Sequence, residues 1–258
     1  LAGTPLSYMG QSWSKPNIGF VNWGGKRTRV MFVGGGYDMG YEDASYNQVN
    51  KVGAGVYMFR AEDEVSPGTG KAGDLLWWGS ANAADSAATT NSGVISGKHA
   101  NMQYSVVSEI RTVDRNGDDL IDHLYFGDLG GQIFRIDLDN SQKVLGSIVK
   151  KPVRIFDGHL DNGKSPRFYD MPAFSLYSNN GTIFAAISQG SGNRSKPLFA
   201  DSSYNYDAMY NIYDKDVARK DLFKAASWTT KDIKPDNSVG LRQIADADDR
   251  RAGPVGGR

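Results

Sequence analysis

The chain contains no cysteine among its 258 residues. This absence excludes disulfide bonds, metal–thiolate centres and a cysteine nucleophile, but it leaves the compartment open because many periplasmic proteins fold without disulfides. The sequence also has no excess of one charge, since 29 Lys and Arg residues balance 29 Asp and Glu residues. A neutral chain without a basic cluster provides no field that would recruit nucleic acid.

No apolar run approaches the roughly 20 residues that a membrane-spanning helix requires, so we expect no membrane span in this segment. The chain begins with Leu1 and shows no signal peptide, and we expect it to be a processed or excised piece of a longer protein. What the sequence does contain is 31 glycines together with 13 tyrosines, 11 phenylalanines and 5 tryptophans. This composition predicts many turns that join short aromatic strands.

A weak internal repeat consists of an apolar strand, a glycine-rich turn and a second strand that ends near an acidic residue. It occurs in residues 29–78, 123–137 and 182–214. In the central copy, alternation places Ile133 and Arg135 on one face and Phe134 and Ile136 on the other. The repeat predicts an all-β fold, and blade-like spacing of this kind is typical of a β-propeller.

We expect the propeller domain to span residues 1–230, with a long surface insertion of small and polar residues at about 79–103. The C-terminal segment, residues 231–258, is rich in glycine and charge, and we expect part of it to be mobile. One helix is predicted over residues 213–226, where Asp214 would cap a mixed charged and apolar turn.

Residues 114–122, which we call the cation loop, place oxygen-bearing groups at alternate positions. Alternate residues of a tightly wound loop point inward, and calcium takes roughly six to eight oxygens at about 2.3–2.6 Å. Clustered carboxylates repel one another, and a bound cation offsets that repulsion. The spacing predicts a calcium site formed by Asp114, Asn116, Asp118, the backbone carbonyl of Leu120, and Asp122, the last directly or through a water.

The cation loop is not an EF-hand, because Asp119 and Tyr125 stand where that motif has Gly and a bidentate Glu. Its flanks, residues 104–113 and 121–126, are rich in β-branched and aromatic residues and predict strands. The alternative is a polar Asx-type turn without an ion. Regular spacing and the freedom of Gly117 to wind tightly favour calcium, with an affinity of roughly micromolar to sub-millimolar.

Several motifs follow one another in an order that resembles the C-terminal propeller of the PilC/PilY proteins, a family of type IV pilus (fimbrium) biogenesis and pilus-tip adhesin proteins. The similarity spans residues 13–217 and includes the stretches 34–38, 57–59, 75–77, 114–137, 167–172 and 187–198. It implies quinoprotein-like blades that are incomplete or part of a seven-bladed ring. It also implies that the five ligands named above hold calcium, whose occupancy tunes pilus extension against retraction.

The resemblance further implies roles in cell adhesion and twitching motility, with partners among pilins, other pilus-machinery proteins or host-surface ligands. The expected location is extracellular or at the cell surface, on the pilus tip or associated with the outer membrane. We do not expect an enzyme. A rival interpretation is a dehydrogenase that uses pyrroloquinoline quinone, because residues 61–63, 70–71 and 75–77 resemble the tryptophan-docking motif of quinoproteins. A second rival is a scaffold propeller without an ion.

Other motifs carry less weight. Residues 158–165 match the P-loop pattern, but Pro166 opposes the long helix that a phosphate cradle needs. We expect Asp128 and Asp137 to fix turns through backbone hydrogen bonds, and His123 to lie on the strand face opposite its neighbour in the cation loop. A second cation loop would have poor ligand spacing and would use Asp157, Asp161 and Asn162.

Overall fold

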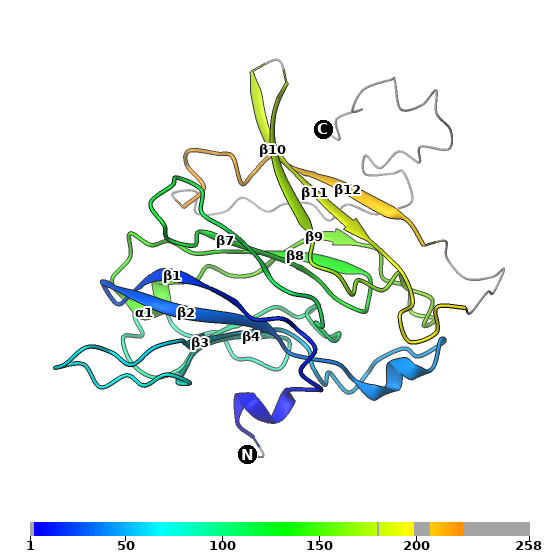
Figure 1. The fold of residues 1–258 in the computed structure, drawn as a ribbon, viewed down its shortest axis with the longest axis horizontal. Coiled ribbons are helices and arrows are strands. Elements are labelled where there is room, and N and C mark those ends of the chain that lie inside the picture. The colour runs from blue at the N-terminus through cyan, green and yellow to red at the C-terminus, as the bar shows by residue number, and fades with distance from the viewer. Residues whose placement is uncertain (1–2, 180, 199–206, 224–258) are drawn as a thin grey trace.

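The computed structural model describes residues 3–179, 181–198 and 207–223, and its regular structure is almost entirely β. Within these residues, 12 strands form three sheets, and each sheet is built from consecutive segments of the chain. Figure 1 shows the sheets stacked, with β1–β4 below, β7–β9 in the middle and β10–β12 above. The expectation of an all-β fold is confirmed. The C-terminal segment 231–258 lies outside the described residues.

The first sheet has the order β1-β2-β3-β4-β5, and its first four strands run antiparallel. Strand β5 instead runs parallel to β4, with Ile95 opposite Trp77. The segment 79–103, predicted as a surface insertion, therefore contains the end of β4 and all of β5, because Ile95 buries itself beside that tryptophan. The strands are β1 (Asn17–Trp23), β2 (Lys26–Gly34), β3 (Val56–Arg60), β4 (Leu75–Ser80) and β5 (Ile95–Lys98).

The second and third sheets are antiparallel throughout. The second contains β6 (Arg111–Val113), β7 (His123–Gly127), β8 (Gln132–Asp137) and β9 (Val153–Asp157). The third contains β10 (Ala173–Asn179), β11 (Thr182–Gly190) and β12 (Met209–Asp214). Helices in the described residues are single turns: the 3-10 helices Pro5–Tyr8 and Met39–Glu42, and α1 (Leu145–Ile148).

Strand β12 shows that the helix predicted over residues 213–226 is wrong in its described part. Tyr213 and Asp214 pair with Ala186 and Ala185 of β11, and residues 215–223 form turns and irregular backbone. The mixed charged and apolar pattern that suggested a helix is overridden by pairing with a neighbouring strand, which buries Ile212.

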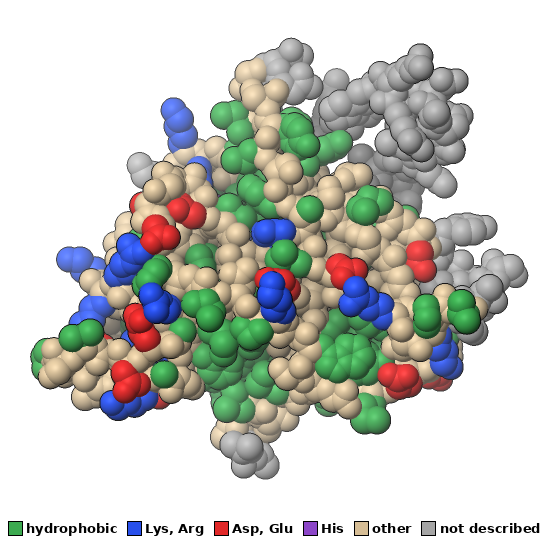
Figure 2. All heavy atoms as spheres, viewed as in Figure 1, with side chains coloured by type: hydrophobic (Ala, Val, Ile, Leu, Met, Phe, Trp, Pro, Cys, Tyr) green, Lys and Arg blue, Asp and Glu red, His purple; other side chains and the backbone are tan. Residues whose placement is uncertain are grey.

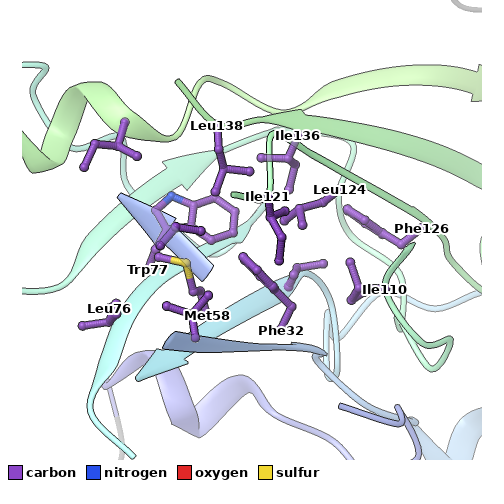
Figure 3. Close-up of a cluster of buried hydrophobic side chains, with 14 of the residues drawn as sticks. Phe32, Met58, Leu76, Trp77, Ile110, Ile121, Leu124, Phe126, Ile136 and Leu138 are labelled. Carbon is purple, nitrogen blue, oxygen red and sulfur yellow. The ribbon is translucent and has the colours of Figure 1, made fainter. Parts of the chain in front are cut away.

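Two apolar cores separate the three sheets. The first lies between the first and second sheets, where Phe32, Met58 and Trp77 meet Leu124 and Phe126 (Figure 3). The second lies between the second and third sheets, and its members include Tyr125, Ile133, Phe156, Ile187 and Ile212. The middle sheet is therefore covered on both faces, which explains why every residue of β7 and β8 is buried.

The faces predicted for β8 are confirmed. Phe134 and Ile136 belong to the first core, whereas Ile133 belongs to the second. Arg135 shares the face of Ile133 and is fully buried, with Nη1 2.6 Å from Oδ2 of Asp214 on β12. A buried guanidinium requires such partners, because an uncompensated charge away from water is strongly destabilising.

Of the two aspartates that were predicted to fix turns, only Asp128 does so. Asp128 begins the β7–β8 turn and accepts hydrogen bonds from the backbone amides of Gly130 at 3.0 Å and Gln132 at 2.9 Å, as predicted. Asp137 instead pairs through its carboxylate with Arg135 at 3.0 Å and with Nδ1 of His123 at 2.7 Å. Its assignment to a turn is wrong, because β8 places Asp137 opposite His123 on the face that bears Arg135.

Candidate metal centre

The cation loop connects β6 to β7 and closes a hairpin in the second sheet. Val113 pairs with His123, and the amide of Asp122 donates to the carbonyl of Val113 at 2.9 Å. Gly117 and Asp119 have φ angles of 79° and 64°, which let the loop wind tightly between the two strands. The strand–loop–strand context predicted from the flanking residues is confirmed, although only the last three residues of the 104–113 flank form a strand.

The end of the cation loop is anchored in the first core. Ile121 is buried there, and Figure 3 shows it among the side chains of Phe32, Leu124 and Ile136. Its backbone amide also donates to the carbonyl of Phe20 on β1 at 2.8 Å. The loop is thus tied to two sheets at one end, while its middle is exposed to solvent.

Three predicted ligands come together in the structure. One carboxylate oxygen from each of Asp114, Asp118 and Asp122 lies within 4.8 Å of the other two. The first two residues are exposed and the third is buried. Among the residues that the structure describes, this is the single group of three or more acidic, histidine or cysteine side chains with such convergence. The group could hold a metal ion.

Backbone amides orient the carboxylates of the cluster. Asp114 Oδ1 accepts from the amide of Gly117 at 2.7 Å, and its Oδ2 accepts from the amide of Asp119 at 2.8 Å. Burial raises the pKa of Asp114, but these amides and others in the loop outweigh it and hold the pKa below its ordinary value. The carboxylate is therefore ionised and ready for a cation at neutral pH.

The other two predicted ligands, Asn116 and Leu120, each donate a hydrogen bond to the carboxylate of Asp118. Asn116 Nδ2 donates to Asp118 Oδ2 at 3.0 Å, and the amide of Leu120 donates to Asp118 Oδ1 at 2.9 Å. The structure places both residues in the same turn as the carboxylates. Ligation by the Asn116 side chain and the Leu120 carbonyl remains a prediction.

Asp122 is held from outside the loop by Asn140, a residue that the sequence did not point to. Asn140 Nδ2 donates to Asp122 Oδ1 at 3.0 Å, and the amide of Arg115 donates to Asp122 Oδ2 at 2.9 Å. Burial raises the pKa of Asp122 above its ordinary value, against the opposing effect of these two hydrogen bonds. A neighbouring divalent cation would favour the ionised carboxylate.

The donor set suits a hard cation. Carboxylate oxygens are ligands that calcium and magnesium take, and no thiolate or imidazole belongs to the cluster of three aspartates. Asp119, by contrast, is an exposed residue of the same loop that forms an ion pair with Arg27 and lies outside the cluster. Figure 2 shows positive and negative side chains interspersed over the viewed face, in keeping with the zero net charge.

The residues of the other candidate motifs form contacts within the protein. In the P-loop-like stretch, Ser165 Oγ accepts from the amide of Leu160 at 2.8 Å, and irregular backbone rather than a helix follows. For the second cation loop, Asp157 pairs with Arg154 at 3.1 Å and Asp161 pairs with His159 at 3.2 Å, so both carboxylates have partners within the protein. Trp77, in the tryptophan-docking-like motif, is buried in the first core.

Comparisons with known proteins support the fold. No protein-family model matches the sequence, and no curated protein matches it. The structure is similar to the crystal structure of the Pseudomonas aeruginosa PilY1 C-terminal domain, with a TM-score of 0.51 and 16% sequence identity. The similarity covers 88% of this chain and 40% of the PilY1 chain, so the chain spans less than half the length of that structure. At this identity the likeness concerns the fold.

Each described helix is a single turn. In the described residues, none is long and apolar enough to cross a membrane. The all-β fold and the acidic cluster together define the class of molecule: a protein of stacked sheets with a candidate cation site on a hairpin loop.

Proposed function

We propose that the chain is a calcium-binding β-propeller module of a type IV pilus biogenesis or tip-associated adhesin protein. The observation that carries this proposal is the convergence of Asp114, Asp118 and Asp122 within 4.8 Å, on a hairpin loop anchored in the core. The similarity to the PilY1 C-terminal domain supports the link to the pilus.

In this proposal the three sheets are consecutive blades. Each sheet is formed by neighbouring strands of the chain, and each packs face to face against the next through an apolar core, as propeller blades do. The chain covers 40% of the PilY1 structure, which favours part of a larger, seven-bladed ring with quinoprotein-like blades over a closed ring of its own.

Calcium would be held by Asp114, Asn116, Asp118, the Leu120 carbonyl and Asp122, and it would neutralise the mutual repulsion of the carboxylates. The amides of Gly117 and Asp119 orient Asp114, while Asn140 orients Asp122. Occupancy would hold the exposed middle of the cation loop closed over the β6–β7 hairpin. A surface segment whose order depends on an ion can change its contacts with a partner, which is the basis we propose for tuning pilus extension against retraction.

The proposed partners are pilins, other proteins of the pilus machinery or host-surface ligands, and the proposed location is the cell surface or pilus tip. Roles in adhesion and twitching motility follow from this placement. We favour a binding module over an enzyme. The burial of Trp77 among apolar side chains supports a structural role for the motif that resembles tryptophan docking in quinoproteins.

Calorimetric titration with calcium tests the site by comparing substitutions at two neighbouring positions of the cation loop. Asp118→Asn and Asp119→Asn each remove one negative charge from an exposed position of the same loop, and Asn tolerates the positive φ of residue 119. We expect wild type to bind with roughly micromolar to sub-millimolar affinity. Asp118→Asn should weaken binding by about tenfold or more, and Asp119→Asn should change it little. An equal loss of calcium affinity in both variants would show that binding depends only on the net charge of the loop.

The role in the pilus is tested separately, in the bacterium that encodes the chain. The same two substitutions are introduced into the full-length protein, and twitching and the number of surface pili are measured. We expect Asp118→Asn to alter both properties and Asp119→Asn to leave them unchanged. Normal twitching in a variant that no longer binds calcium would contradict the regulatory role while leaving the cation site in place.

A further inference from the structure

A groove distinct from the cation loop opens where four separate segments of the chain meet. It has a volume of about 380 Å³, within the range of small-molecule sites. Its polar and aromatic lining comes from the segment before β1, the segment before β6, the segment before β10, and the turn after β11. We call it the tryptophan groove and define it by Trp13, Lys15, Glu109, Tyr169, Asp170 and Arg194.

Trp13 provides a fixed aromatic surface in this groove. Its indole stacks on Tyr37 with ring centroids 3.9 Å apart and planes 8° from parallel. Tyr37 is itself buried, and its hydroxyl is held by Glu42 at 2.8 Å and by Ser195 at 2.6 Å. Trp13 nevertheless remains 48% exposed. A large apolar ring that is rigidly supported from one side and left open on the other loses little conformational entropy when a ligand covers it.

Two ion pairs flank the indole. Lys15 lies 3.5 Å from Glu109, and Arg194 lies 2.6 Å from Asp170. Both partners of the second pair are well exposed, and exposed pairs of this kind contribute little to the stability of a fold. Their donors and acceptors can therefore exchange partners with a ligand at small cost. The two positive and two negative charges cancel, so the groove has no net field for an ionic ligand.

These features select a ligand that is uncharged, has an apolar face, and carries many groups that both donate and accept hydrogen bonds. A pyranose ring meets all three conditions, because the C–H groups of one face can cover an indole while hydroxyls at its edge bond to carboxylate and guanidinium groups. A phosphate or nucleotide would be opposed by Glu109 and Asp170, and a cationic peptide by Lys15 and Arg194. We propose that the tryptophan groove binds a neutral saccharide.

The test begins with an array of immobilised oligosaccharides, some neutral and some sialylated or sulfated, probed with the intact chain. We expect at least one neutral oligosaccharide to be bound, and its soluble form is then titrated calorimetrically. Trp13→Ala and Asp170→Asn should each weaken binding by about tenfold or more, the loss expected for a missing contact of this kind. Tyr177→Ala, which truncates an exposed aromatic side chain on β10 outside the groove, should bind like wild type.

Melting curves identify any variant that fails to fold. If Trp13→Ala does not fold, Trp13→Phe replaces it, because phenylalanine keeps an aromatic ring on Tyr37. To separate this groove from the cation loop, the oligosaccharide is titrated into wild type with calcium, into wild type with a chelator, and into Asp118→Asn. We expect the same affinity for the oligosaccharide in all three titrations. The proposal is overturned if no neutral oligosaccharide binds, if only anionic ones bind, or if the groove variants bind like wild type. It is equally overturned if binding requires calcium and Asp118, or if a peptide array but no oligosaccharide is bound through Trp13.

Discussion

Asn140 and Asp122 are joined by a hydrogen bond of 3.0 Å between Asn140 Nδ2 and Asp122 Oδ1. The same amide group also donates to the carbonyl of Ile121 at 3.0 Å, and Asn140 Oδ1 accepts from the amide of Asn22 on β1 at 2.8 Å. A single side chain therefore positions the buried carboxylate of the cluster against both the first and the second sheet.

Replacing this side chain should weaken cation binding without removing a ligand. For Asn140→Ala we expect calcium affinity to fall by about tenfold, because residues that orient a ligand typically contribute 10–100-fold. Calorimetric titration measures the change. Ser141→Ala is the matched control, since its hydroxyl bonds to Asp139 at 2.6 Å and not to the cation loop. Unchanged affinity in Asn140→Ala would show that Asp122 is positioned by the backbone alone.

Calcium should stabilise the folded chain. A ligand that binds only the native state at 100 times its dissociation constant raises the free energy of unfolding by about 2.7 kcal/mol. We expect a gain of this size in urea unfolding curves recorded with calcium rather than with a chelator. In Asp118→Asn, whose affinity should be lower by tenfold or more, we expect a gain of about 1.4 kcal/mol or less. A wild-type curve that does not move with calcium would contradict the cation site.

Asp128 should make stability depend on pH. Burial raises the pKa of Asp128 to about 7, against the opposing hydrogen bonds from Gln132 and Gly130. In the unfolded chain the carboxyl group ionises near pH 4, whereas in the folded chain it keeps its proton up to about pH 7. Its contribution is therefore complete below pH 4 and is lost as the pH rises to about 7, a decrease on the order of a few kcal/mol.

The Asp128→Asn variant carries no titrating group at this position, so its stability should decline less than that of wild type between pH 4 and pH 7. Urea unfolding at several pH values, with chelator present, measures the two slopes. The comparison concerns the slope rather than the absolute stability, because the amide also changes the hydrogen bonds to Gln132. Parallel curves would show that Asp128 is ionised in the folded chain throughout this range.

The buried ion pairs of Arg135, one of which joins the second and third sheets, should contribute far more to stability than those on the surface. Arg135→Met leaves Asp137 and Asp214 buried without their cation, and we expect a loss of about 3–5 kcal/mol in the free energy of unfolding. Lys71→Met removes an exposed partner of Asp63 and should cost less than about 1 kcal/mol. Thermal or urea unfolding compares the two variants. Similar losses would mean that the buried cluster contributes no more than a surface pair.

Local patterns in the sequence were sufficient for the strands with strong alternation. The predicted stretches 29–33, 123–126, 132–137 and 182–187 all lie in strands, and the faces of Phe134 and Ile136 are as expected, because period-two burial leaves a direct trace in the residue order. Strand β5 was not predicted, and the helix over 213–226 was predicted wrongly, because β5 and the end of β12 depend on pairing with another strand, which composition does not record.

The candidate site was predictable to the same extent. The spacing of Asp114, Asp118 and Asp122 was enough to predict their convergence, because a nine-residue loop closed by a hairpin brings alternate side chains together. Asn140 could not be found, since it follows β8 and reaches the loop only after the second sheet has formed. The tryptophan groove was equally hidden, because its lining comes from four segments that meet only in the folded chain.

The pairing of Arg135 with Asp214 also favours one register of β12 in the third sheet. Side chains along a strand alternate between faces, so sliding β12 by one residue along β11 would turn Asp214 away from the guanidinium and bring Tyr213 toward it. Misalignment would then remove one of the two carboxylates that pair with the buried guanidinium of Arg135. The carboxylate of Asp214 thus favours the observed alignment of β12 on β11 over alignments shifted by one residue.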